Sequence, residues 1–216
     1  MKHMIKAVIF DLDGVISDTN KLHASIEASL LKENGINVKP DELMKNYAGL
    51  SDKEFFKKIL KDYGISGDAD TLYKEKWERM MPIAANNILP IPGAIKIIND
   101  LKERGLKIGI SSASPLKFIE LVLSKLGLKE KFDAITSGEE VKYGKPNPEI
   151  FSLTAKKLKV NSQECLVIED SDNGMTAAKK AGMKCIGLVK EEAKKHPADL
   201  ILTTLENLTV EKIINL

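Results

Sequence analysis

Short apolar runs alternate with segments of helical periodicity over most of this chain. The first run, residues 7–10, holds only small, β-branched and aromatic apolar side chains, which predicts a strand buried on both faces. Similar runs predict further strands at 107–110, 133–136, 165–168, 184–188 and 199–202. Apolar positions three or four apart predict helices between them, at 94–101, 115–126, after Asn147 and at 171–181. This alternation predicts an α/β fold with a doubly wound, Rossmann-like parallel sheet.

Polar residues directly before prolines mark where two of these helices begin. Ser114 precedes Pro115 and Asn147 precedes Pro148. Both pairs predict an N-cap followed by proline at the first helical position, where its missing N–H costs nothing. We therefore expect Ser114 and Asn147 to cap the helices that follow them.

Helical patterns also fill the long segment between the first two predicted strands. Leu22, Ile26 and Leu30 recur at helical spacing, and Ser51-Asp52-Lys53-Glu54 is a capping box that starts a second helix. A third helix is expected from about 70 to 84. A crossover between parallel strands needs only about a dozen residues, so this segment is too long to be a simple connection.

The excess length predicts two domains. We expect a helical cap domain at residues 15–90, inserted after the first strand of an α/β core domain that is formed by residues 1–14 and 91–216. Polar or breaker-rich segments at 14–19 and 86–92 flank the insertion. They predict hinges that let the cap close over a substrate.

Composition narrows the range of partners. The 33 basic and 31 acidic residues are interspersed and leave a net charge of +2, so we expect neither nucleic acid nor a membrane surface as a partner. Arginine occurs only at Arg79 and Arg104, so a bound phosphate would rely on lysine and backbone amides. Cys165 and Cys185 lie in strand-like runs, which favours reduced, buried thiols over a disulfide. We expect a cytoplasmic protein, either a monomer or a weak homodimer.

Carboxylates follow the first predicted strand directly. Asp11 and Asp13 are two residues apart, which places both side chains on one side of an extended backbone. Two like charges this close indicate either a bound cation or a proton that the pair shares, although Asp and Gly are also common in solvated turns. Other polar residues follow later strands at the same expected edge of the sheet, namely Ser112, Lys145, Glu169 and Asp170.

These motifs occur in a specific order. The chain resembles the haloacid dehalogenase superfamily, in the branch with a helical cap after the first strand. The resemblance covers nearly the whole chain and rests on Asp11-Leu12-Asp13-Gly14-Val15, Ser112, Gly144-Lys145-Pro146 and Glu169-Asp170-Ser171.

The resemblance implies a mechanism of phosphoryl transfer. Asp11 would be the nucleophile that forms an aspartyl phosphate, and Asp13 would protonate the leaving oxygen and later deprotonate the attacking water or sugar hydroxyl. Mg²⁺ would be held by Asp11, the backbone carbonyl of Asp13, and Asp170, with Glu169 acting through a water. The nucleophile, the acid and the metal ligands would thus come from two strand ends.

The resemblance also implies how the phosphate is held. Lys145 and Ser112, together with backbone amides near Leu12 and Ala113, would bind its equatorial oxygens. The expected substrate is a small phosphorylated metabolite, such as a sugar phosphate or a phosphoglycolate-like compound. A non-catalytic phosphate sensor on the same fold is the alternative from another functional class.

Rival motifs fail on spacing. An EF-hand loop starting at Asp11 would have its glycine at the fourth position instead of the sixth, and Leu22 in place of the final glutamate. Residues 138–145 resemble a P-loop with one residue too many, and Pro146 replaces the metal-binding Ser or Thr. Asp13 favours phosphoryl over carbon–halogen chemistry, because a true dehalogenase would not be expected to keep this second acid.

The cap segment bears on whether water or a sugar accepts the phosphoryl group. His23 resembles a β-phosphoglucomutase residue that orients Asp13, and an ordinary, partly exposed helix histidine is the alternative interpretation. Asp52 stands where the mutases have an arginine for the distal phosphate; Lys53 is adjacent and is the candidate substitute, whereas the plain interpretation of this segment is a helix cap. We therefore expect a phosphatase, with β-phosphoglucomutase as the alternative.

Overall fold

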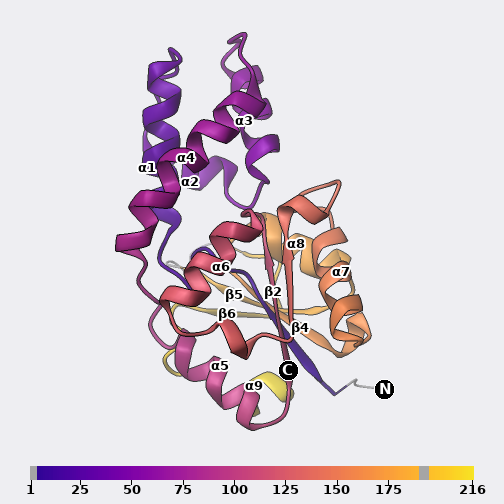
Figure 1. Ribbon diagram of the computed structural model, residues 1–216. Helices are drawn as coiled ribbons and strands as arrows, with labels where there is room; N and C mark the ends of the chain where they lie inside the picture. Colours follow the sequence, from indigo (N-terminus) through magenta and orange to yellow (C-terminus); the bar gives the residue numbers. More distant parts are fainter. Residues whose placement is uncertain (1–3, 190–194) are drawn as a thin grey trace.

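The computed structural model describes residues 4–189 and 195–216, so residues 1–3 and 190–194 of the predicted core lie outside it. Within these ranges the strands form one six-stranded parallel sheet in the order β3-β2-β1-β4-β5-β6 (Figure 1). The strands are β1 (Ala7–Phe10), β2 (Lys107–Ser112), β3 (Ala134–Ser137), β4 (Cys165–Glu169), β5 (Lys184–Leu188) and β6 (Leu200–Leu202). The predicted α/β fold is confirmed.

Helices cover both faces of the sheet. Val8 and Phe10 of β1 pack into one apolar cluster together with residues of α5 (Ala94–Glu103), α6 (Leu116–Lys125) and α9 (Val210–Ile214). Ala7 and Ile9 point the other way, into a second cluster with α7 (Glu149–Leu158) and α8 (Asp172–Lys180). Both faces of this central strand are therefore buried, which explains its uninterrupted apolar sequence.

Residues 20–87, which lie between β1 and α5, fold into helices that gather beyond one end of the sheet (Figure 1). We call α1 (Asn20–Glu33), α2 (Pro40–Tyr47), α3 (Asp52–Asp62) and α4 (Ala69–Asn87) the helical lobe. The capping box at the start of α3 is present, with Ser51 accepting from the Glu54 amide. Helix α2 was not predicted from the sequence, although Pro40 before two acidic residues is a helix-start signal.

The predicted N-cap at Ser114 is wrong. Helix α6 begins at Leu116 with Pro115 in the cap position, and the Ser114 hydroxyl donates to Asp13 instead. A hydrogen bond between the Ser114 hydroxyl and an ionised carboxylate is stronger than one between the same hydroxyl and a neutral backbone amide. This difference explains why Ser114 binds Asp13 instead of capping the helix. Helix α7 begins at Glu149, one residue later than expected, and Asn147 Oδ1 still accepts from the Glu149 amide at 3.0 Å.

Both cysteines are free and buried, as expected for reduced thiols. Burial raises the pKa of the Cys165 thiol to about 12. No helix in the described part of the chain combines the length and apolar character needed to cross a membrane.

Candidate active site

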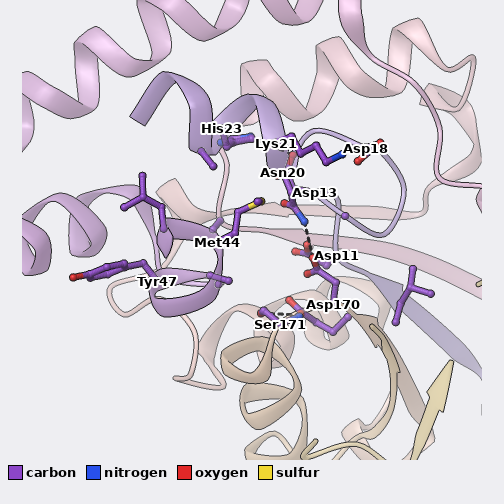
Figure 2. A pocket seen from close by; sticks show the side chains of 18 of the residues that line it. Asp11, Asp13, Asp18, Asn20, Lys21, His23, Met44, Tyr47, Asp170 and Ser171 are labelled. Atoms are coloured by element: carbon purple, nitrogen blue, oxygen red, sulfur yellow. Dashed lines mark hydrogen bonds and ion pairs between the residues drawn. The ribbon is translucent and has the colours of Figure 1, made fainter. Parts of the chain in front are cut away.

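The carboxyl ends of the central strands meet below the helical lobe at a cavity of about 850 Å³. Its lining comes from both parts of the molecule, from Asp11, Lys145 and Asp170 on the sheet side and from α1, α2, α3 and α4 on the lobe side. Figure 2 shows His23 of α1 and Met44 of α2 beside the acidic strand ends. Distant parts of the sequence thus share one site.

A buried lysine connects the ends of β1 and β4. Lys145, only 3% exposed, donates from Nζ to Asp11 Oδ1 and to Glu169 Oε1, both at 2.6 Å. Burial raises the pKa of Asp11 to about 7 against the opposing effect of the Lys145 ammonium. Burial opposes the charge on Lys145, but the carboxylates of Asp11 and Glu169 raise its pKa above the usual value. The lysine is therefore held as a cation against the predicted nucleophile.

The same carboxylates form a cluster suited to a divalent cation. Oxygens of Asp11, Glu169 and Asp170 lie within 4.8 Å of one another. Burial, together with the charges of Glu169 and Asp11, raises the pKa of Asp170 well above its usual range, which is the expected effect where buried carboxylates lack enough positive charge. Carboxylate oxygens are the ligands that Mg²⁺ prefers. The residues present therefore fit the predicted metal.

Neighbouring side chains fix the orientation of these acids. Asn20 of α1 donates from Nδ2 to Asp170 Oδ2 at 2.7 Å (Figure 2). Glu169 Oε2 accepts from the Ser171 amide at 2.6 Å and from its hydroxyl at 2.9 Å. Glu169 is consequently held by Lys145 on one oxygen and by Ser171 on the other.

Asp13 is surrounded by hydroxyl donors and a histidine. Ser114 donates to Asp13 Oδ2 at 2.8 Å, Thr19 donates to Oδ1, and His23 Nε2 lies 3.3 Å from Oδ1. Burial raises the pKa of Asp13, but His23 and these hydrogen bonds outweigh it and lower the pKa to about 2. Sequence reasoning missed Thr19 and Ser114 as site residues, because the sequence pattern predicts a helix cap at Ser114 and nothing marks the hydroxyl of Thr19 as a partner of Asp13.

Other predicted site residues differ in their placement. Ala113 lines the cavity, whereas Ser112 is fully buried behind it, accepts from the Ser114 amide at 3.1 Å and lies 3.5 Å from Asp13 Oδ2. Lys53 lies away from the cavity lining, with its side chain 57% exposed and Nζ 3.1 Å from Asp70 Oδ1. The structure thus brings the core residues and His23 together but places Lys53 apart from them.

Acids from two strand ends meet Lys145 at one edge of the sheet. Together with the family and the relatives described next, this site supports a phosphoric monoester hydrolase, with a phosphomutase as the alternative. The chain belongs to the haloacid dehalogenase-like hydrolase family, whose model matches residues 8–188. The resemblance seen in the sequence is therefore confirmed.

Named relatives cover nearly the whole chain. Hexitol phosphatase B of Escherichia coli is 31% identical over 97% of this chain and 97% of its own length. A β-phosphoglucomutase of Bacillus subtilis is 33% identical over 96% of this chain and 93% of its own. A β-phosphoglucomutase from Clostridium difficile with a known crystal structure is 35% identical in sequence. The structural match covers 97% of this chain and 96% of the C. difficile chain, with a TM-score of 0.84.

Proposed function

We propose that the protein is a Mg²⁺-dependent phosphatase that hydrolyses a small phosphorylated metabolite through an aspartyl phosphate on Asp11. The observation that carries the proposal is the placement of Asp11 in direct contact with Lys145 and within 4.8 Å of Asp170, at the floor of one cavity. A carboxylate nucleophile needs such neighbouring positive charge to approach a phosphate dianion.

Each residue has a distinct part in this chemistry. A carboxylate oxygen of Asp11 attacks phosphorus in line and displaces the leaving oxygen, which takes a proton from Asp13. Asp13 then removes a proton from the water that attacks the aspartyl phosphate and releases inorganic phosphate. Lys145 and the backbone amide of Ala113 stabilise the charge on the transferring group.

Asp11, Asp170 and the backbone carbonyl of Asp13 are the proposed Mg²⁺ ligands, with Glu169 acting through a water. When bound, Mg²⁺ would offset the repulsion between carboxylates and phosphate and favour the ionised form of Asp11. Asp13 lies close to the incoming phosphate, whose negative charge raises the pKa of that carboxyl and favours its proton-donating form.

Release of phosphate from a panel of phosphorylated metabolites tests the proposal. We expect turnover with Mg²⁺, loss of turnover after EDTA treatment and recovery when Mg²⁺ is restored. Asp11→Asn should retain the fold and lose turnover by about a thousandfold or more, since the nucleophile is removed. Binding of phosphate without turnover would favour the sensor alternative instead.

A second candidate function is β-phosphoglucomutase. The contact between His23 Nε2 and Asp13 Oδ1 at 3.3 Å favours it, because this is the contact that the resemblance to the mutases implied. Incubation of β-glucose 1-phosphate with catalytic glucose 1,6-bisphosphate separates the candidates. A phosphatase releases free phosphate faster than it forms glucose 6-phosphate, and a mutase does the reverse.

The free thiols agree with the proposed cytoplasmic location.

A further inference from the structure

The lobe side of the cavity contains a buried ion-pair cluster that the proposed mechanism does not use. Lys76 of α4 is fully buried and donates from Nζ to Glu27 Oε1 of α1 at 2.5 Å and to Asp52 Oδ1 of α3. Glu27, Asp52 and Lys76 all line the cavity. We call these residues the lobe cluster.

The lobe cluster lies next to the proposed acid. His23, which is 3.3 Å from Asp13 Oδ1, has a ring nitrogen within 4.8 Å of carboxylate oxygens of Glu27 and Asp52. In the proposed mechanism Asp13 protonates the leaving oxygen, and His23 lies beside Asp13 on the lobe side of the cavity (Figure 2). A leaving group on that side of the cavity would therefore lie beside the cluster.

Charge and hydrogen-bonding capacity indicate what this wall accepts. Two carboxylates share one ammonium, so the cluster carries a net negative charge, and the ammonium already fills the position that a bound cation would take. Asp52 Oδ2 is buried and has no hydrogen-bond partner in the described part of the chain. This unpaired carboxylate oxygen adds to the negative charge of the wall, which therefore repels anions and tolerates neutral hydroxyls.

We propose, resting on the phosphatase function proposed above, that the lobe cluster selects monophosphate esters of neutral, hydroxyl-rich alcohols over substrates whose leaving group carries a carboxylate or a second phosphate. A neutral, hydroxyl-bearing leaving group is accepted beside Glu27 and Asp52, whereas a second anion on the leaving group is repelled by their net negative charge. This narrows the substrate class to sugar or polyol monophosphates and disfavours phosphoglycolate-like compounds.

Exposed lysines at the rim of the cavity determine which substrates can test this inference. Lys21 of α1 and Lys45 of α2 also line the cavity and would attract the far end of a long bisphosphate. A three-carbon substrate keeps its distal group beside the lobe cluster. Glycerol 3-phosphate and 3-phosphoglycerate differ only in whether that distal group is a hydroxymethyl or a carboxylate, so they form a matched pair.

The experiment measures kcat/KM for both compounds with Mg²⁺ present. For the wild type we expect a preference of about tenfold or more for glycerol 3-phosphate, as repulsion between like charges at this range implies. Asp52→Asn should narrow the ratio several-fold. Glu27→Gln should shift it in the same direction and serves as a second variant if Asp52→Asn does not fold. Asp70→Asn, which removes an exposed lobe carboxylate outside the cavity lining, should leave the ratio unchanged.

The outcomes separate this inference from the function on which it rests. Equal or faster hydrolysis of 3-phosphoglycerate by the wild type would overturn the inference and leave the phosphatase proposal standing. An unchanged ratio in both Asp52→Asn and Glu27→Gln would also overturn it. Absence of phosphate release from every phosphorylated compound would remove the proposed function, and the inference with it.

Discussion

Asp13 is held by side chains that come from three parts of the sequence. Thr19 follows it in the loop before α1, Ser114 lies in the loop after β2, and His23 is on α1. A buried carboxylate needs such donors, because leaving it without hydrogen bonds would cost more than the bonds themselves contribute. We expect these neighbours to position the proposed acid.

Ser114→Ala should lower kcat with little change in KM. It removes the 2.8 Å hydrogen bond to Asp13 Oδ2, and loss of one hydrogen bond to a charged group corresponds to about a tenfold effect on the rate. Steady-state kinetics check this, with the exposed Ser124→Ala on α6 as the matched control. Wild-type kcat in Ser114→Ala would show that Asp13 does not depend on this contact.

The sequence predicted which acidic strand ends would meet, but not every residue around them. Asp11, Lys145 and Asp170 were predictable as neighbours because carboxyl ends of parallel strands share one edge. The hydroxyl of Ser114 was not, since only the fold brings the competing Asp13 acceptor within reach. The ion pair of Lys76 with Glu27 could not be predicted for the same reason, because the two residues are 49 positions apart in the sequence.

At the level of elements, close packing of α8 on β4 positions the metal-site acids. Helix α8 begins after Ser171, whose hydroxyl accepts from the Gly174 amide. A Cβ at Gly174 would lie 2.0 Å from Glu169 Cδ, so only glycine lets the helix approach the end of the strand this closely. The position of Glu169 therefore depends on this helix.

Gly174→Ala should lower kcat, raise the Mg²⁺ concentration for half-maximal activity and destabilise the fold by about 1–3 kcal/mol, as overpacking typically does. The cause is displacement of Glu169 by the added methyl group. Gly67→Ala is the control, because its Cβ would contact only the Leu60 side chain, at 3.1 Å. Unchanged kcat and Mg²⁺ dependence would show that Glu169 does not need its present position.

A carboxylate at the start of β6 should make stability depend on pH. Partial burial raises the pKa of Asp199, but hydrogen bonds from Lys179 Nζ at 2.6 Å and the Cys185 amide at 2.8 Å outweigh it and lower the pKa below the usual 3.8. Because the pKa of Asp199 is lower in the folded state than in the unfolded state, the ionised carboxylate stabilises the fold fully above pH 3.8. This stabilisation is lost as the pH falls through the folded-state pKa.

Asp199→Asn should therefore reduce the free energy of unfolding at neutral pH, and the difference from wild type should shrink once the pH falls below about 4. Urea unfolding across a pH series measures this difference. Glu130→Gln, which removes an exposed carboxylate elsewhere, serves as the control. A difference that persists unchanged at pH 3 would contradict the assignment to charge.

At the scale of the whole molecule, the helical lobe contacts the core through aromatic packing and through polar contacts. The rings of Trp77 and His23 pack against Phe118 of α6, with centroids 5.0 and 5.4 Å apart. Asn173 Nδ2 of α8 donates to the Ala48 carbonyl at 2.8 Å, and the Gly144 amide lies 3.4 Å from Glu54 Oε1. The connections to the lobe run beside each other, with the Asp18 amide donating to the Leu89 carbonyl at 2.9 Å. The lobe was predictable from its excess length; its contacts with the sheet were not, since they join residues far apart in sequence.

Because the two connections to the lobe lie side by side, they can act as one hinge, and we expect the lobe to open and close there. Dyes on Lys57→Cys in α3 and Lys129→Cys near β3 would report the motion, since the native thiols are buried. Energy transfer should change when Mg²⁺ and vanadate are added, and a dye pair placed on the sheet-side positions Lys125→Cys and Lys159→Cys should not respond. Identical transfer with and without vanadate would contradict closure.

The central claim, that Asp11 carries the phosphoryl group, has a direct test. The enzyme is mixed with Mg²⁺ and a ³²P-labelled sugar monophosphate, quenched in acid within milliseconds, digested and mapped. The account predicts a transient label on the peptide that contains Asp11, released by hydroxylamine and absent from Asp11→Asn. Rapid turnover with no enzyme-bound label at any quench time, or a label on another residue, would contradict it.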